Sequence, residues 1–263
     1  MAEDFLSRTI KEYYESPGVS EDYVRRTGLH PAERSLLERL AGDMEGETVL
    51  DIGVGPGRTL PWVRAMAGLY VGIDYSPRML APGRERFPNA NLLLCDARST
   101  AFADGTFGAV FFWNALDDVG HQDRLRILRE VHRVLKPGGA FAFGIHNLDA
   151  DLRSPWSLPG LTASGGLAAA LRENAARWKK WAAGLVHHLR TWRHQKRGRG
   201  YAILGDDFFN FSLLTYYVTL EEQIRQLNGA GFPSRELMAR DGTPIAPGER
   251  RRDAWIFFLA RRS

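Results

Sequence analysis

The sequence has almost no cysteine, and it lacks any apolar run long enough to cross a bilayer. Cys95 is the single cysteine among 263 residues, which excludes an intramolecular disulfide and a metal site built from several cysteines. No stretch approaches the roughly 20 apolar residues of a membrane-spanning helix. The opening Met-Ala-Glu-Asp has neither the basic start nor the apolar centre of a signal peptide. We therefore expect a cytoplasmic protein without paired-thiol chemistry and without a metal.

The chain also has little excess of one sign of charge over the other, except in one segment. The net charge is +4, and 44% hydrophobic with 25% charged residues is the composition of an ordinary globular protein. Residues 172–199, here called the basic segment, hold nine Lys or Arg against one acid, Glu173. Nucleic-acid-binding proteins usually spread their basic charge more widely, so a nucleic acid is not the expected partner.

Apolar runs alternate with helical patterns through the middle of the chain, which favours a parallel sheet covered by helices. The chain before residue 47 has helical patterns, and the alternation stops between about 148 and 211. We therefore expect an α/β, Rossmann-like fold with a seven-stranded, mostly parallel sheet and helices on both faces. The expected parts are an N-terminal helical cap at 1–46 and a main domain at 47–263, with an inserted helical lid or substrate segment at about 148–211. The expected strands are 48–52, 69–73, 91–95, 109–113, 140–145, 236–239 and 254–260.

A glycine-rich turn follows the first expected strand and reads Asp51-Ile52-Gly53-Val54-Gly55-Pro56-Gly57. Glycines at this corner of a doubly wound sheet let a ligand contact the main chain. The dinucleotide fingerprint Gly-x-Gly-x-x-Gly, counted from Gly53, needs its last glycine at position 58, where the chain has Arg58. A dehydrogenase is therefore the least favoured enzyme class.

The pattern Asp-x-Gly-x-Gly-x-Gly instead resembles the first motif of class I S-adenosylmethionine-dependent methyltransferases. Later landmarks of that family follow in order over about residues 45–147, and they are Leu69 to Asp74, Cys95-Asp96-Ala97, Phe107 to Asn114, and Leu128 to Gly139 with its Lys136-Pro137-Gly138-Gly139. The resemblance implies the cofactor S-adenosyl-L-methionine, with S-adenosyl-L-homocysteine as product.

The family also implies roles for the matching residues. Its first-motif acid, here Asp51, faces the amino group of the cofactor, its second acid, Asp74, accepts the ribose hydroxyls, and its third, Asp96, binds the adenine amino group. Tyrosines of N-terminal helices often touch the methionine end, for which Tyr23 is the choice, with Tyr13 and Tyr14 as alternatives. The expected cofactor-binding residues are Asp51, Gly53, Gly55, Gly57, Asp74, Tyr75, Asp96, Ala97, Asn114 and Tyr23.

Methyl transfer needs an aligned nucleophile, and it needs a general base only if the acceptor keeps its proton. His146 follows the fifth expected strand, at the edge where open α/β sheets bind ligands, and is the candidate general base. The alternative is a structural side chain that caps the strand end. Asp117 and Asp118 either bind a cationic substrate amine or are simply solvated.

The insertion contains an amphipathic helix with Lys and Arg around one apolar face. Three interpretations stay open: a lid or packing helix with this face on the domain, capture of an acidic substrate, and peripheral contact of residues 171–199 with an anionic membrane surface. The segment 201–218 is rich in aromatic residues and is expected to form a substrate roof. The apolar face is formed by Leu171, Ala175, Trp178, Ala182, Leu185, Leu189 and Trp192.

The sequence thus predicts transfer of a methyl group to O, N or C of a small-molecule acceptor, for instance in secondary metabolism, in an oligomeric state left open. One alternative, favoured by the basic segment, is an RNA methyltransferase. Against it, Asn114 is followed by Ala-Leu-Asp rather than by the Pro-Pro-Tyr of amino-methylating nucleic-acid enzymes. The other is a regulator that binds S-adenosylmethionine without catalysis.

Overall fold

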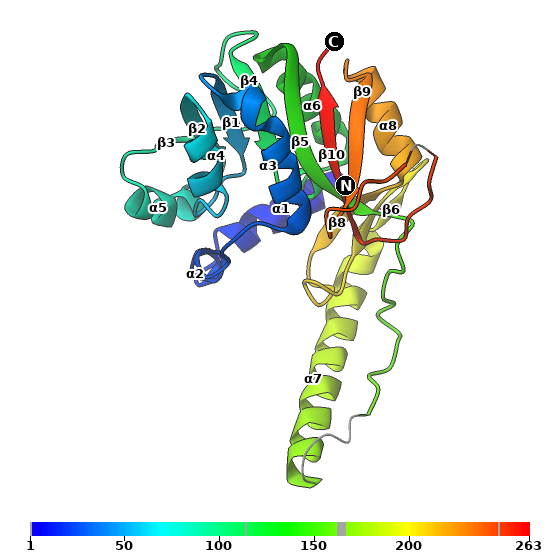
Figure 1. Ribbon diagram of the computed structural model, residues 1–263. Coiled ribbons are helices and arrows are strands. Elements are labelled where there is room, and N and C mark those ends of the chain that lie inside the picture. The colour runs from blue at the N-terminus through cyan, green and yellow to red at the C-terminus, as the bar shows by residue number, and fades with distance from the viewer. Residues whose placement is uncertain (1, 114, 162–166, 247) are drawn as a thin grey trace.

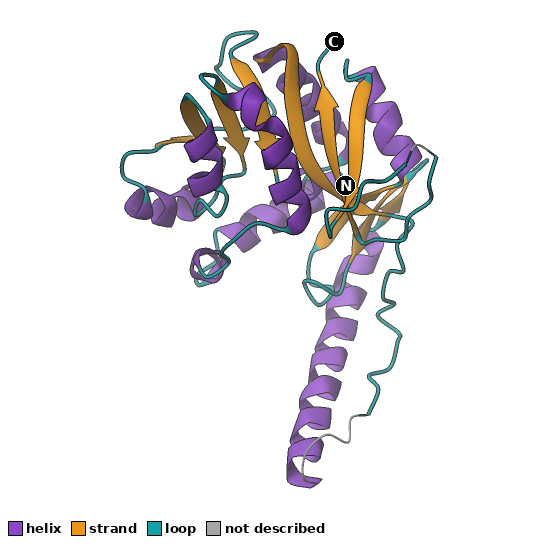
Figure 2. Cartoon of the chain, viewed as in Figure 1, coloured by secondary structure: helices purple, strands orange, loops and turns teal. Residues whose placement is uncertain are grey.

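A twisted sheet with helices on both faces forms the body of the protein (Figures 1 and 2). The computed structural model describes residues 2–113, 115–161, 167–246 and 248–263. Seven strands of the main sheet run in the order β3-β2-β1-β4-β5-β10-β9, and all are parallel except β10, which is antiparallel to both of its neighbours. The mostly parallel sheet expected from the sequence is therefore confirmed, although the described sheet has ten strands rather than seven. Its strands are β1 (Thr48–Ile52), β2 (Leu69–Asp74), β3 (Asn91–Leu94), β4 (Phe107–Phe112), β5 (Leu135–Asn147), β9 (Ser234–Ala239) and β10 (Trp255–Arg261).

A second, smaller set of strands joins the sheet at the carboxyl end of β5. There His146 pairs with Trp255 of β10 on one side and with Tyr217 of β8 (Leu214–Val218) in parallel register. β8 continues antiparallel to β7 (Tyr201–Gly205), and β7 pairs with the two-residue β6 (Lys196–Arg197). The sheet therefore forks at His146, and this branch of three strands was not predicted from the sequence.

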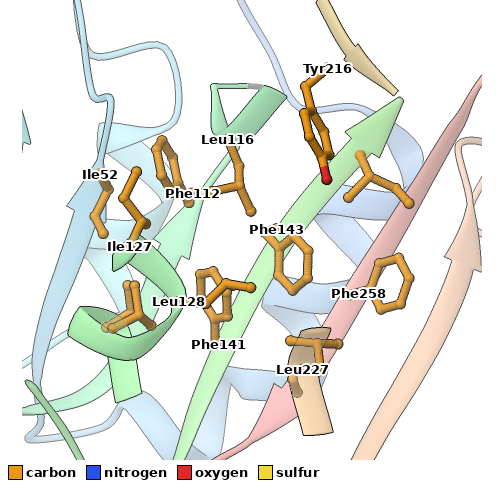
Figure 3. Packing of buried hydrophobic residues seen from close by; sticks show 14 of the residues in the cluster. Ile52, Phe112, Leu116, Ile127, Leu128, Phe141, Phe143, Tyr216, Leu227 and Phe258 are labelled. Atoms are coloured by element: carbon orange, nitrogen blue, oxygen red, sulfur yellow. The ribbon is translucent and has the colours of Figure 1, made fainter. Parts of the chain in front are cut away.

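Two layers of helices cover the main sheet because their apolar stripes face it. One layer consists of α3 (Pro31–Met44), α4 (Leu60–Met66) and α5 (Pro77–Arg86), and the other contains α6 (His121–Val134) and α8 (Leu220–Gly229). Figure 3 shows Ile127 of α6 beside Ile52 and Phe112 and Leu128 beside Phe141, and Leu227 of α8 belongs to the same core. Because Leu36, Leu37 and Leu40 of α3 belong to the core on this face of the sheet, α3 is part of this layer.

The remaining N-terminal helices, α1 (Ala2–Tyr14) and α2 (Val19–Val24), lie at the edge where the parallel strands end (Figure 1). α1 buries Leu6 and Ile10 in the core that contains α6. Its Phe5 ring stacks on the ring of His194 with centroids 3.8 Å apart. These contacts fix α1 across the carboxyl ends of the strands.

α7 (Leu167–Thr191) extends away from the body rather than over it (Figure 1). The chain before it, from about residue 148 to 161, runs outward from the body beside the helix. The apolar face that we expected against the domain is largely exposed at Leu171, Trp178 and Leu189. In the described part of the chain, this face of α7 therefore does not pack on the domain. Among the described residues, no helix combines the length and the apolar character needed to cross a bilayer.

Candidate functional site

A cavity of about 950 Å³ lies at the carboxyl ends of β1, β2, β4 and β5. Its floor is the glycine-rich turn with the ends of these strands, and its cover comes from α1, α2 and the pair Phe208 and Phe209. In the part of the chain that the structure describes, no residue of α7 lines it. Ligand pockets usually measure about 300–1,000 Å³, so this volume suits a cofactor together with a small second ligand.

The glycine-rich turn is held open by main-chain hydrogen bonds. The N–H groups of Gly53 and Val54 donate to the Ile73 carbonyl at 2.8 and 3.1 Å. Gly53, Gly55 and Gly57 have φ of +68°, +48° and +81°, which side chains rarely tolerate. A Cβ on Gly57 would lie 2.8 Å from the Phe87 ring, whereas one on Gly55 would meet nothing closer than Met79, at 3.4 Å. Gly57 is thus needed for packing, while Gly55 presents bare main chain to the cavity.

Asp74 fixes this turn and faces the cavity. Its Oδ2 accepts from the Gly55 N–H and its Oδ1 from the Ser76 N–H, both at 2.9 Å. Burial raises the pKa of Asp74 to about 6, against the opposing effect of these two donors. A carboxylate oriented by main-chain donors keeps lone pairs for a pair of hydroxyl groups, as the resemblance implies for ribose.

Asp51 is almost fully buried beside the turn and also lines the cavity. Thr59 Oγ1 and Tyr70 OH donate to its Oδ2 at 2.8 and 3.0 Å. Burial raises the pKa of Asp51 to about 6. A ligand ammonium at this carboxylate would supply the positive partner that favours its charged form.

The other candidate cofactor residues occupy the rim of the cavity. Asp96 accepts from Arg98 Nη2 at 2.6 Å, and Arg98 also pairs with Asp123 at 2.9 Å. The Arg98 hydrogen bonds lower the pKa of Asp96, so its carboxylate is charged and already has one partner. Ala97, Tyr75 and Tyr23 line the cavity, whereas Asn114 lies outside the described residues.

His146 also lines the cavity, and it belongs to a buried polar network. Its Nδ1 lies 2.9 Å from Asp117 Oδ2, and its main-chain N–H donates to the same oxygen at 2.6 Å. Asp117 Oδ1 accepts from Arg124 Nη1 at 2.7 Å, and both of these side chains are almost completely buried. When Nδ1 donates to Asp117, Nε2 is the nitrogen left to accept a proton. Asp117 is therefore not a solvated residue.

For Asp118 the sequence leaves two roles open, a contact with a substrate amine and a solvated side chain. It lines the cavity, and its Oδ2 accepts from Tyr14 OH at 2.7 Å, while Tyr14 OH lies 3.4 Å from Tyr23 OH. Burial raises the pKa of Asp118 to about 7, with the Asp117 carboxylate adding to the effect. The structure thus brings together Tyr14 and Tyr23, which the sequence could not place relative to the sheet.

Several lining residues were missed because they are distant in sequence. Trp255 packs on the His146 ring with centroids 3.8 Å apart, and only the pairing of β10 with β5 brings them together. From the expected aromatic roof at 201–218, only Phe208 and Phe209 line the cavity, while Tyr216 and Tyr217 are buried in β8. Most of this segment is therefore core.

Arg58, where a dinucleotide fingerprint would have glycine, connects the turn to the N-terminal segment. Its Nη1 and Nη2 donate to the two Glu33 oxygens at 2.7 and 2.6 Å, and Nη1 also donates to the Gly28 carbonyl. The helix after the turn, α4, begins at Leu60.

The donor and acceptor set of the cavity fits S-adenosylmethionine. The bare main chain at Gly53 and Gly55 leaves room for the thioether chain, Asp51 suits an ammonium and Asp74 suits a diol. Trp113 Nε1 is buried in the lining, and no partner for it occurs among the described residues. In the same part of the chain, no group of three or more His, Cys, Asp or Glu is placed to hold a metal ion.

Comparisons with known proteins agree with this geometry. Residues 49–139 match the family model described as methyltransferase domain. The chain is 38% identical over 125 residues to a ubiquinone/menaquinone biosynthesis C-methyltransferase of Desulfotalea psychrophila, covering 44% of this chain and 48% of the relative. It is 31% identical over 135 residues to a demethylmenaquinone methyltransferase of Corynebacterium kroppenstedtii, covering 50% and 57%. The chain thus spans about half the length of the curated relatives it matches.

Solved structures show the same fold at low sequence identity. An S-adenosylmethionine-dependent methyltransferase of Mesorhizobium loti superposes with a TM-score of 0.58 at 19% identity, covering 88% of this chain and 98% of the other. A phosphoethanolamine N-methyltransferase of Haemonchus contortus, in complex with phosphomonomethylethanolamine and S-adenosylhomocysteine, gives 0.55 at 18%, covering 100% and 60%. Residues 49–139 thus match a methyltransferase domain, and the chain as a whole has the fold of solved S-adenosylmethionine-dependent methyltransferases.

Proposed function

We propose that this chain transfers the methyl group of S-adenosylmethionine to a small hydroxylated aromatic acceptor. The observation that carries the proposal is His146, which lines the same cavity as the glycine-rich turn and lies at hydrogen-bond distance from Asp117. Asp51, Asp74 and the turn hold the cofactor, with Asp96, Ala97, Tyr75 and Tyr23 around it. When bound, the cofactor supplies a methyl group that its sulfonium has already activated.

The residues on the acceptor side explain why a base is useful. A phenolic hydroxyl is a weak nucleophile until it loses its proton, and His146 Nε2 can accept that proton. Asp117 keeps the imidazole in the tautomer that leaves Nε2 free, and it stabilises the imidazolium that forms. The resulting phenolate can react at oxygen or at a ring carbon, so the base serves both outcomes.

The wall of the cavity favours a flat acceptor. Tyr14, Phe208, Phe209 and Trp255 line it from three different elements or loops. Aromatic side chains bind flat rings through stacked or edge contacts. The matching relatives are named for methylation in quinone biosynthesis, which is consistent with an acceptor of this kind.

The test is formation of S-adenosylhomocysteine with phenols and hydroquinones compared with primary amines as acceptors. We expect turnover with the hydroxylated rings and a loss of about 10²–10⁴-fold in His146→Ala. Residual turnover of this variant should rise with pH, because the acceptor then ionises in solution. Full turnover of His146→Ala at every pH would remove the base from the mechanism.

An amine acceptor is the second candidate, and Asp118 favours it. The partly buried carboxylate, with its pKa raised to about 7, faces the cavity and would regain its charge beside a substrate ammonium. In that case, Asp118→Asn would raise the KM for amines by about tenfold or more and leave the KM for phenols unchanged. An equal effect on both acceptor classes would argue against a specific amine site.

Two further candidate functions, RNA methylation and cofactor binding without catalysis, can be distinguished with the same protein. An RNA acceptor would give labelled RNA after incubation with radiolabelled S-adenosylmethionine and extract. The described part of the basic segment does not line the cavity, which favours a small molecule. A regulator without catalysis would bind the cofactor tightly and label nothing.

A further inference from the structure

One face of α7 carries exposed apolar side chains along most of its length. Leu171, Trp178, Val186 and Leu189 are 62%, 39%, 46% and 54% exposed. At 100° per residue these four positions fall within about a quarter of the helix circumference, and at 1.5 Å per residue they extend over about 27 Å. We call them the exposed stripe. Large apolar side chains in one line on a surface indicate an interaction site.

The opposite face of α7 is attached to the protein, which fixes the direction of the exposed stripe. His187 Nδ1 lies 3.0 Å from the Asn210 carbonyl oxygen, and Thr191 is buried. A Cβ on Gly184 would lie 2.7 Å from Asn210 Oδ1, so the loop packs tightly on this side of the helix. α7 therefore cannot turn its apolar face towards the body without breaking these contacts.

Basic residues accompany the exposed stripe. Helical geometry places Arg172, Lys179 and Arg190 along one flank of it. The single acid of the basic segment, Glu173, falls on the far side of the helix by the same geometry. The surface is thus apolar in the middle and positive at its border, which calls for a partner with an apolar interior and a negative surface.

We propose that α7 lies flat on a bilayer that contains anionic phospholipid, with the exposed stripe in the boundary between headgroups and acyl chains. Trp, Leu and Val at this depth, with Lys and Arg at the phosphates, are the composition of an interfacial helix. A nucleic acid would bind the cations but leave the stripe in water. A second copy of the chain would cover the stripe but bring two basic flanks together.

The test is flotation of the full chain with vesicles. Phosphatidylglycerol mixed with phosphatidylcholine is compared with phosphatidylcholine alone, at low and at high salt. We expect binding to the anionic vesicles that weakens with salt, because the basic flank acts through screened charge. Neither cofactor nor acceptor is present, so the result is independent of the proposed methyl transfer.

Two variants separate the apolar from the charged contribution. Leu171→Gln/Trp178→Gln/Leu189→Gln removes the exposed stripe, and Lys179→Glu/Arg190→Glu reverses the flank. We expect each to lower the partition coefficient by at least tenfold, since one charge alone contributes roughly fivefold. The matched controls are Leu69→Gln and Arg64→Glu/Arg129→Glu, whose side chains are exposed on the body. Circular dichroism and thermal unfolding verify that all variants are folded.

Three results would overturn the proposal. One is equal flotation of the stripe variant and the native chain. A second is binding to RNA without binding to anionic vesicles. The third is a native chain that does not bind vesicles and forms a dimer in light scattering, together with a stripe variant that is monomeric.

Discussion

At the scale of single residues, Asp74 has the clearest expected role. Asp74→Ala removes an acceptor for two hydroxyl groups and also the acceptor of the Gly55 and Ser76 N–H groups. We expect S-adenosylmethionine affinity to fall by at least about 100-fold, because hydrogen bonds to a charged group contribute about 1.5–3 kcal/mol each. Calorimetric titration measures it, with Glu85→Ala, an exposed acid of α5, as the control. Unchanged affinity in a folded Asp74→Ala protein would contradict the site.

Asp118 gives a prediction about pH and stability. Folding raises its pKa from the ordinary 3.8 to about 7, so the folded chain binds this proton more tightly than the unfolded chain does. The stability that Asp118 contributes is therefore fully present below pH 3.8 and is lost as the pH rises through about 7. Asp51 and Asp74, with pKa values raised to about 6, act in the same direction.

Asp118→Asn keeps an acceptor for Tyr14 OH and removes the charge. We expect this variant to be more stable than the native chain by about 1–3 kcal/mol at pH 8, with a smaller gain at pH 5. Urea unfolding at the two pH values measures the difference. A gain of equal size at both would mean that the charge of Asp118 is not its cause.

At the scale of elements, the Arg58–Glu33 pair connects the glycine-rich turn to α3. The Glu33 side chain is completely buried, and Arg58 is its charged partner. We expect Arg58→Ala to destabilise the protein by about 3–5 kcal/mol, because it leaves a buried carboxylate without its cation. Arg58→Ala/Glu33→Gln should recover part of this loss in a double-mutant cycle.

The matched control for this pair is the exposed ion pair of Arg252 and Asp151. Such pairs contribute about 0–1 kcal/mol, so Arg252→Ala should be nearly neutral. If Arg58→Ala were equally neutral in urea unfolding, the pair would not anchor the turn.

The elements also show where prediction from sequence succeeded and where it could not. The main sheet follows from apolar runs with turns between them, which are local signals. The segment that forms β7 and β8 is predicted from sequence to be a substrate roof, because its tyrosines do not indicate which strand it pairs with. The amphipathic pattern of α7 predicts a helix with two different faces, but it does not say which face the protein covers. The structure shows that the apolar one is exposed.

The same distinction holds for the candidate site. Asp51, the glycines and Asp74 lie in short motifs, so their grouping could be predicted. Asp117 faces His146 only after β5 has paired with β4, and Trp255 arrives with the antiparallel β10. Contacts between segments about 30 to 110 residues apart depend on topology, which no local pattern contains.

At the scale of the whole molecule, cofactor binding should appear as thermal stabilisation. A ligand at 100 times its Kd contributes about 2.7 kcal/mol, which corresponds to a Tm increase of roughly 5–10 °C for a chain of this size. Differential scanning fluorimetry with S-adenosylmethionine should show this increase, and NAD at the same concentration should show none. A shift with NAD alone would restore the dinucleotide interpretation that Arg58 argues against.

The fork of the sheet at His146 affects how a protein of this kind can evolve to use a different acceptor. Trp255 of β10 and Tyr217 of β8 pair with the main chain of His146 from opposite strands, and their rings pack against its imidazole. The proposed base is thus part of the rigid framework, while Tyr14, Phe208 and Phe209 come from outside the main sheet. Substitutions in these outer parts can reshape the space for a new acceptor without displacing the proton-accepting group, so reactivity and selectivity can evolve separately.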